Sequence, residues 1–417
     1  MLFKIYNILW LILVPFAKIW LHYRVYKNLE NKNRLSERYG FSSIKKPLGK
    51  IIWIHASSIG EAVSGIALTE GLRKEGYTGN ILFTTFTLSA SNYIQNYTNI
   101  IHQYIPLDHY NWVNNFLNHW QPDLAIMVES EIWPNLVLKS HAKKIPLIMA
   151  SGQISQKSYK NWLKIGLSNS SRIFKSFDLI MAVDSYQVKI FKNLGGENIR
   201  SFGSLKVSAL MKKPDLTLIK KLTNVSKNKL VIVASSTHDG EEEIIINSIK
   251  KLLQNNIKLL LIIVPRHIQR GPEIIKKLKL NSKLRSSNEF PSRQDSFWVA
   301  DSFGELNSFY SISDIVIVCG SFFSKGGHSP VEPCHFKTSI IIGPNNFKNS
   351  ETVSEMIKNN AIIKLKDNNV DTLSKVLLDL SENKHLQTKL SIASSKLVKN
   401  WKERKLSGAK LCLKLLK

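Results

Sequence analysis

Short runs of apolar residues recur along this chain, and each is separated from the next by a segment long enough for a helix. One series lies at residues 51–54, 81–83, 124–128, 146–149 and 179–182, and another at 230–233, 259–264, 315–319 and 339–342. Short runs rich in Ile, Val and Leu between helical segments are typical of parallel strands buried on both faces. The pattern predicts an α/β fold of two doubly wound, Rossmann-like domains that face each other across a cleft.

A longer apolar segment covers residues 2–23, and Lys4 and Lys18 bracket its most apolar part. The uncharged run between them is short for a full span, which usually needs about 20 apolar residues, but Trp10 and Trp20 suit a membrane interface. No small-residue cleavage site follows, so a removed signal peptide is not expected. We predict a single membrane anchor at residues 1–24 that spans the bilayer or lies in its interface, with the remaining chain on the cytoplasmic side. The alternative is the buried first helix of a soluble domain.

The two series of predicted strands set the domain boundaries. We expect a first domain at residues 25–208, a polar, Lys-rich linker at 209–229, and a second domain at 230–417 whose last helix could cross back to the first. No internal repeat or low-complexity tract interrupts this organisation.

The chain of 417 residues has 58 Lys and Arg against 31 Asp and Glu, a net charge of +27. Such a surface suits phospholipid headgroups, a phosphorylated glycolipid or nucleic acid, although a Lys-rich composition inherited from an AT-rich genome would look the same. Basic stretches interleaved with aromatic residues are missing, so we expect no nucleic-acid partner. The three cysteines, Cys319, Cys334 and Cys412, form no C-x-x-C pair. This pattern is typical of a protein in a reducing, cytoplasmic compartment, and it argues against a structural zinc site.

A glycine-rich segment follows the apolar run 315–319 and extends from Gly320 to Pro333. Glycines allow backbone N–H groups to approach a phosphate, and we expect a helix to begin near Glu332, where its N-terminus would favour negative charge. The Glu332 carboxylate could then accept the hydroxyls of a ribose. These features indicate a sugar-nucleotide pocket, and the alternative is an ordinary loop between a strand and a helix.

Acidic residues follow two predicted strands of the first domain. Glu61 lies in the first turn of a predicted helix, where it could take a proton from an acceptor hydroxyl or merely complement the helix dipole. Glu129 and Glu131 follow the run 124–128 and could bind sugar hydroxyls or stabilise positive charge on a transferred sugar. No other hard ligands lie near them in the sequence, so we predict no metal site.

The second domain also carries polar turns after its strands. Arg266 could pair with a phosphate or carboxylate, whose geometry matches a guanidinium. His238 and His267 are more typical of hydrogen-bonding loop residues than of catalysts. The segment 301–306 adds backbone groups and an acid at the same edge.

Taken in order, these motifs resemble those of the Kdo (3-deoxy-D-manno-octulosonic acid) transferases of lipopolysaccharide assembly, over nearly the whole chain. The matching motifs are Arg34-x-x-Glu37-Arg38-x-Gly40, His55-Ala-Ser-Ser-Ile-Gly-Glu61, Glu129-Ser-Glu-Ile-Trp-Pro-Asn135, Gly203-Ser-Leu-Lys206, Ser236-Thr-His-Asp-Gly-Glu-Glu242, Pro265-Arg-His267, Gly304-Glu-Leu306, Gly326-Gly-His-Ser-Pro-Val-Glu-Pro333 and Gly343-Pro344.

The resemblance implies a GT-B fold and an inverting glycosyltransferase at the cytoplasmic face of the inner membrane. It implies CMP-Kdo as donor, the 6′-hydroxyl of lipid IVA as acceptor, and no cofactor. Glu61 would be the general base, and Glu131 and Lys206 would stabilise the transition state. The residues implied to line the CMP site are Pro265, Arg266, Phe303, Gly304, Glu305, Ser329, Pro330, Val331 and Glu332.

The chain departs from the family pattern at three places. Ser151-Gly-Gln-Ile-Ser155 stands where Asn-Ala-Arg-Leu-Ser is common, and Ser204 and Ser329 stand where Asn is usual. These changes leave the details of acceptor binding and the number of Kdo units open. An alternative enzyme is another lipid-linked GT-B transferase that uses a UDP-sugar, and a non-enzymatic alternative is a basic, membrane-tethered protein that binds nucleic acid.

Overall fold

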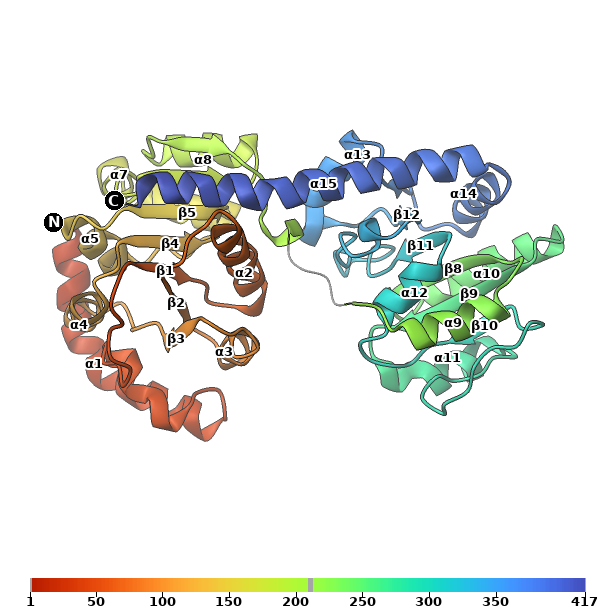
Figure 1. The fold of residues 1–417 in the computed structure, drawn as a ribbon, viewed down its shortest axis with the longest axis horizontal. Coiled ribbons are helices and arrows are strands. Elements are labelled where there is room, and N and C mark those ends of the chain that lie inside the picture. The colour runs from red at the N-terminus through yellow and green to blue at the C-terminus, as the bar shows by residue number, and fades with distance from the viewer. Residues whose placement is uncertain (1, 209–212, 417) are drawn as a thin grey trace. The chain divides into compact units, whose positions relative to one another are not determined.

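The computed structural model describes residues 2–208 and 213–416, and the chain forms two compact units, each built around its own parallel sheet (Figure 1). The first unit contains Met1–Ala209 and Trp401–Lys417, and the second contains Leu210–Asn400. Within the predicted linker, residues 209–212 lie outside the described residues, and the remainder contains helix α9 (Leu216–Val225). Two successive doubly wound α/β domains, as predicted, are therefore confirmed.

The sheet of the first unit has seven strands in the order β3-β2-β1-β4-β5-β6-β7, and all its pairings are parallel. The strands are β1 (Ile51–His55), β2 (Asn80–Thr85), β3 (Ile101–Tyr104), β4 (Leu124–Val128), β5 (Leu147–Gly152), β6 (Leu179–Ala182) and β7 (Ile199–Ser201). Central strand β1 is buried on both faces, with Trp53 packed in one core cluster and Ile52 and Ile54 in the other.

Helices cover both faces of this sheet. Their bounds are α2 (Ile59–Lys74), α3 (Leu88–Ile94), α4 (Tyr110–Trp120), α5 (Pro134–Ala142), α6 (Gln156–Lys164), α7 (Leu167–Phe174) and α8 (Ser185–Asn193), with 3-10 turns η1 (Lys32–Tyr39) and η2 (Lys206–Ser208). Helices α4, α5, α7 and α8 bury side chains in the core that contains Trp53, whereas α2 and α3 pack on the opposite face. The doubly wound topology leaves the carboxyl ends of all seven strands on one edge, where polar loops follow them.

The second unit repeats this plan with six parallel strands in the order β10-β9-β8-β11-β12-β13. Its strands are β8 (Leu230–Thr237), β9 (Leu259–Pro265), β10 (Phe297–Val299), β11 (Ile315–Val318), β12 (Ser339–Ile342) and β13 (Ile363–Lys364). Besides α9, its helices are α10 (Glu241–Gln254), α11 (Gly271–Leu278), α12 (Leu306–Ile312), α13 (Ser350–Lys358) and α14 (Val370–Glu382), with short turns η3 (Ile268–Arg270), η4 (Pro333–His335) and η5 (Phe347–Asn349).

The last helix, α15 (Lys384–Leu415), begins in the second unit and ends in the first. Ala409 and Cys412 are fully buried in the core cluster formed with α2. The two helices approach closely at Gly71, where an added Cβ would lie 2.6 Å from the carbonyl oxygen of Lys405. Lys405 also reaches Glu70 with its Nζ at 2.8 Å. The C-terminal part of α15 is thus an integral layer of the first unit.

The N-terminal apolar segment forms helix α1 (Leu2–Tyr26), which packs along the first unit beside α4 (Figure 1). The Tyr6 hydroxyl donates a hydrogen bond to Asp108 at 2.9 Å, and Trp10 meets Trp112 of α4 edge-on with ring centroids 6.1 Å apart. Most of the helix is nevertheless exposed, and by length and composition it is apolar enough to cross a membrane.

A buried ion pair fixes the segment that follows α1. Arg38 is fully buried and donates to both carboxylate oxygens of Glu30, at 2.8 and 3.0 Å, and to the carbonyl oxygen of Ile105 at 3.1 Å. Burial lowers the pKa of the Arg38 guanidinium, whereas the neighbouring Glu30 charge raises it. Removing one partner of such a pair leaves an uncompensated charge in the interior.

We expect Arg38→Met to lower the free energy of unfolding of the first unit by about 3–5 kcal/mol, because Glu30 would stay buried without its partner. Urea denaturation followed by tryptophan fluorescence measures this loss. The matched control is Lys45→Met at an exposed position, for which we expect a change within about 0.5 kcal/mol. Equal stability of the two variants would show that Arg38 does not stabilise this segment.

Candidate functional site

Glu61 lies at the carboxyl edge of the first sheet, where β1 leads into α2. Ser58 caps this helix, and the two residues form a capping box in which each side chain binds the backbone of the other. The Glu61 carboxylate accepts hydrogen bonds from the Ser57 N–H at 2.6 Å and from the Ser58 hydroxyl at 2.9 Å. The predicted place in the first helical turn is confirmed, and these bonds give Glu61 a structural function in addition to any chemical one.

Glu131 lies in the loop after β4, and three groups hold its carboxylate. The His55 Nε2 lies 3.3 Å from its Oε2, and the Trp133 indole N–H donates to the same oxygen at 2.7 Å. Burial raises the pKa of Glu131, but hydrogen bonds from His55, Ser57 and Trp133 outweigh this effect and place the pKa at about 2. Glu131 is therefore a fixed anion at neutral pH.

The orientation of His55 follows from a chain of hydrogen bonds across the sheet. The indole N–H of Trp53 donates to the Thr84 hydroxyl at 2.8 Å, and that hydroxyl lies 3.0 Å from Nδ1 of His55. Nδ1 also lies 3.2 Å from the backbone carbonyl oxygen of Thr84, so Thr84 fixes the ring. Because the ionised carboxylate of Glu131 can only accept a hydrogen bond, Nε2 of His55 carries a proton. The fully buried imidazole then donates Nε2–H to Glu131. The sequence analysis included His55 in a motif but did not identify it as the partner of Glu131.

Glu129 adds a third carboxylate to this edge of the sheet. Its backbone has a left-handed φ of 60°, and its carboxylate accepts a hydrogen bond from the Gln153 amide at 2.8 Å. Burial raises the pKa of Glu129, while Gln153 and the Lys206 charge lower it. Gln153, at the position where the family pattern has Arg, thus holds Glu129 without neutralising it.

Lys206 supplies the positive charge of this cluster. It begins turn η2 and is exposed, and its Nζ lies 3.6 Å from the position that a Cβ on Gly60 would occupy. A glycine at position 60 therefore leaves room for the ammonium group next to the start of α2. The structure brings together the predicted residues Glu61, Glu131 and Lys206.

The crowding of acids changes the proton affinity of Glu61. Burial raises the pKa of its carboxyl most, and the Glu131 charge raises it further, against the lowering effect of the Ser57 and Ser58 hydrogen bonds. A carboxylate with a raised pKa is a stronger proton acceptor than an exposed one. One acid held as an anion beside another with a raised pKa is the arrangement expected where the two have different chemical functions.

In the second unit the predicted nucleotide residues follow three strands, β9, β10 and β11, of which β9 and β10 are neighbours in the sheet. Pro265 ends β9 and Arg266 comes directly after it, exposed at the carboxyl edge. Phe303 and Gly304 follow β10, and the Phe303 side chain is 89% exposed. Glu305 is held by Arg285, whose guanidinium donates to both carboxylate oxygens, at 3.1 and 2.8 Å.

Ser329, Pro330, Val331 and Glu332 follow β11, but the helix predicted to begin near Glu332 is wrong. Glu332 precedes only the three-residue turn η4, and β12 begins at Ser339, so the chain has no room for a longer helix. The N–H groups and dipole of a full helix are therefore not available here to a phosphate. The Glu332 residue as a whole is exposed, but the surrounding protein partly buries its carboxyl and thereby raises the pKa of that group.

Glu241 organises the loops of this edge, and the sequence analysis assigned it no function. Its buried carboxylate accepts three backbone N–H groups, those of His238 at 2.9 Å, Gly320 at 2.8 Å and Phe322 at 3.1 Å. One side chain thus joins the loop after β8 to the glycine-rich loop after β11. Three glutamates in a row at the start of α10 were the signal in the sequence, but which loops they would hold depends on the order of the strands.

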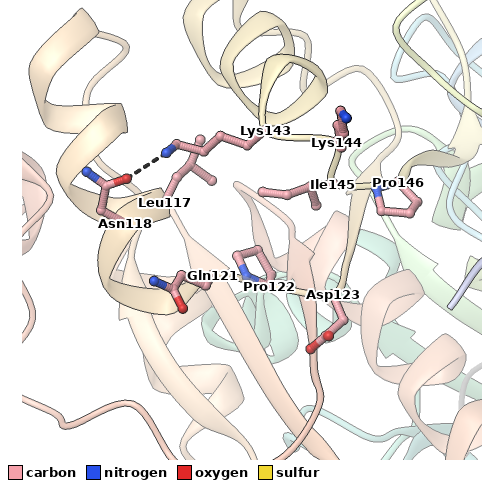
Figure 2. Close-up of a pocket in the computed structure, with 9 residues that line it drawn as sticks. All are labelled: Leu117, Asn118, Gln121, Pro122, Asp123, Lys143, Lys144, Ile145 and Pro146. Carbon is pink, nitrogen blue, oxygen red and sulfur yellow. Dashed lines mark hydrogen bonds between the residues drawn. The ribbon is translucent and has the colours of Figure 1, made fainter. Parts of the chain in front are cut away.

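The cavities of the first unit include two that are not lined by the acidic residues of the carboxyl edge. One, of about 440 Å³, opens at the amino ends of β4 and β5, where Lys143 points toward Asn118 and donates to it at 2.6 Å (Figure 2). None of the predicted catalytic residues lines it. The other, of about 330 Å³, is lined almost entirely by apolar side chains of α1 and α6, including Phe3, Leu9 and Trp162. Among residues 2–208 and 213–416, no cluster of three or more His, Cys, Asp or Glu side chains has the geometry of a metal site.

Comparisons with known proteins agree with this arrangement. A family model described as 3-deoxy-D-manno-octulosonic-acid transferase (kdotransferase) matches residues 33–209. The chain is 32% identical over 399 residues to the 3-deoxy-D-manno-octulosonic acid transferase of Haemophilus influenzae, a match that covers 93% of this chain and 92% of the relative. It is 30% identical over 390 residues to that of Rickettsia bellii, covering 92% and 93% of the two chains.

Among solved structures, a glycosyltransferase from Rickettsia africae superposes with a TM-score of 0.59 at 14% identity, covering 89% of this chain and 100% of that chain. This likeness concerns the fold alone, and it agrees with the predicted GT-B architecture. The sequence matches extend over both domains and include the acidic edge of the first. The chain therefore belongs to the 3-deoxy-D-manno-octulosonic acid (Kdo) transferase family of glycosyltransferases.

Proposed function

We propose that this enzyme transfers Kdo from CMP-Kdo to the 6′-hydroxyl of lipid IVA with inversion at the anomeric carbon, and that Glu61 is the general base. The observation that carries the proposal is the meeting of Glu61, Glu131 and Lys206 at one sheet edge in a member of the Kdo transferase family. Incubating membranes that contain the enzyme with CMP-Kdo and lipid IVA, then weighing the product, tests the reaction and counts the sugars. A UDP-sugar transferase would instead be inhibited by UDP in preference to CMP.

The first domain would hold the acceptor and remove its proton. Glu61 takes the proton as the hydroxyl oxygen forms its bond to the anomeric carbon, and the bond from that carbon to the CMP phosphate breaks. Glu131, fixed as an anion, would stabilise the positive charge that develops on the sugar. Lys206 would stabilise the negative charge that is present in the transition state. The reaction as proposed uses no resident metal or other cofactor, and EDTA is expected to leave turnover unchanged.

The second domain would bind CMP-Kdo. Arg266 is exposed, and a guanidinium matches the geometry of a phosphate or carboxylate. The exposed ring of Phe303 offers a flat surface for the cytosine base, and the loop 329–332 would contact the ribose.

Helix α1 supports a membrane location for the proposed reaction. An exposed apolar stripe runs along it at helical spacing and contains Ile8, Leu11, Ile12, Phe16 and Ile19. The apolar cavity beside α1 has the character needed for an acyl chain of the lipid acceptor. With a net charge of +27, the chain would be attracted to an anionic membrane surface, and we place its domains on the cytoplasmic face of the inner membrane.

We expect Glu61→Gln to lower turnover by roughly 10²–10⁴-fold while CMP binding is kept, because glutamine can maintain a capping box but cannot accept the proton. Glu61→Ala should lose the capping box as well and be no more active. The control is Glu197→Gln, an exposed acid of the same domain. If glutamine restored activity that alanine abolishes, the function of Glu61 would be structural only.

The pH profile of kcat/KM offers an independent test of the same base. Glu61 must be ionised to act, so activity falls as the pH drops through its raised pKa. Removing the Glu131 charge in Glu131→Gln should lower that pKa, and the acid limb should move to lower pH even though the rate itself falls. An acid limb at an unchanged pH would contradict the proposed pairing of Glu61 with Glu131.

Loss of the Arg266 guanidinium should weaken donor binding. We expect Arg266→Ala to raise the dissociation constant of CMP by about ten- to a hundredfold, the effect of one charge-assisted hydrogen bond, as measured by calorimetry. Arg293→Ala, at an exposed position of the same unit, is the matched control. Equal CMP affinity in the two variants would remove Arg266 from the donor site.

A further inference from the structure

Two histidines at the carboxyl edge of the second sheet contact each other directly. His238 follows β8 and His328 lies in the glycine-rich loop after β11, and their Nε2 atoms are 2.9 Å apart. The rings are nearly parallel, with an angle of 4° between their planes. Both are only partly buried, so a ligand can reach them.

The distance between the two nitrogen atoms limits the protonation of the pair. At 2.9 Å they form a hydrogen bond, in which one ring donates Nε2–H and the other accepts with its lone pair. The accepting ring has no proton on Nε2 and is therefore neutral. While this hydrogen bond persists, the pair carries at most one positive charge.

The backbone around the pair is fixed. Glu241 binds the N–H of His238 and also the N–H of Gly320. The His328 ring rests on Gly320, where an added Cβ would lie 2.7 Å from its Cδ2, and the His328 N–H donates to Cys319 at 3.1 Å. These contacts hold the two rings against each other.

Basic side chains surround the two imidazoles and disfavour their protonation. They come from three loops, after β9, β11 and β12, and are Arg266, His267, Arg270, Lys325 and Lys348. Burial and these charges lower the pKa of His328 to about 4, and they also lower the pKa of His238.

In the described part of the chain, the nearby acids pair with Arg270 but not with the other cations at the rings. Glu241 is occupied by backbone N–H groups, Glu242 binds Thr237 and Arg270, and Asp239 binds Lys277 and Arg270. Within residues 2–208 and 213–416, the exposed side chains of Arg266, Lys325 and Lys348 form no ion pair. The pair therefore lies in a positive environment that lacks an anion.

We propose that the His238–His328 pair is a seat for the phosphate of the nucleotide donor and takes up a proton from solvent as the phosphate binds. The inference rests on the proposed CMP-Kdo donor and deepens it. The phosphate supplies a negative charge beside the pair, so protonation of the accepting ring at Nε2 becomes favourable in the complex. Both rings then carry a proton on Nε2, and each can donate a hydrogen bond to a phosphate oxygen. When the bond from Kdo to the phosphate breaks, its electron pair stays on an oxygen that these protons stabilise.

Calorimetry on the full chain tests proton uptake directly. The probe is the methyl ester of CMP, a phosphodiester that does not itself titrate near neutral pH, and cytidine serves as the probe without a phosphate. Titrations in two buffers of different ionisation enthalpy report the protons taken up. We expect the uptake of nearly one proton for each ester molecule bound. The affinity for the ester should rise about tenfold for each unit by which the pH is lowered between about 8 and about 6.5. Cytidine should bind with no uptake.

The variants are His238→Gln and His328→Gln, with His385→Gln as the matched control at an exposed position of α15. Both pair variants should bind the ester more weakly, without proton uptake and with little pH dependence, and the control should match the parent chain. Two results would overturn this inference and leave the proposed CMP-Kdo donor intact. One is that the parent chain binds the ester without taking up a proton, and the other is that both pair variants still take up a full proton. If the parent chain binds neither the ester nor CMP, the proposed CMP-Kdo donor itself is wrong.

Discussion

Because every strand of both sheets runs parallel to its neighbours, each chain segment leaves its sheet at the same edge. Parallel neighbours need a crossover connection between them, and the helices that provide it cover both faces of each sheet. The consequence is that residues far apart in the sequence meet without any special device. In the first unit the loops after β1, β4 and β7 bring Glu61, Glu131 and Lys206 together, and in the second the loops after β8 and β11 join at Glu241.

The two edges carry opposite kinds of chemistry. The edge of the first unit concentrates carboxylates and holds one of them, Glu131, as an anion through His55. The edge of the second unit concentrates cations, and its buried Glu241 is held by backbone N–H groups of two loops. A glycosyl transfer from an anionic donor to a neutral hydroxyl needs a proton acceptor on one side and neutralisation of a leaving phosphate on the other. In the proposed reaction, the first domain would serve the former task and the second domain the latter.

The sequence predicted the central strands of the two sheets better than their edge strands. All nine predicted strands are present, and the four that were missed, β3, β7, β10 and β13, are the edge strands of the two sheets. An edge strand is partly solvated and needs no continuous apolar run, so segments such as 199–201 carry polar residues and give no signal. The prediction of a helix after Glu332 was wrong for a different reason. Strand β12 begins at Ser339, so too few residues remain between Glu332 and this strand for a full helix. Motifs located Glu61 and Glu131, but the hydrogen bonds that keep Glu131 ionised come in part from His55 and Ser57, which only the folded sheet brings near it.

The path of α15 affects how the protein can be made. Ala409 and Cys412 complete the core of the first unit, yet they are synthesised after the entire second unit. A nascent chain on the ribosome therefore exposes one apolar face of its first sheet, next to α2, until the final residues emerge. Such a protein cannot mature strictly one domain at a time, and the unfinished first domain is a natural client for chaperones during translation.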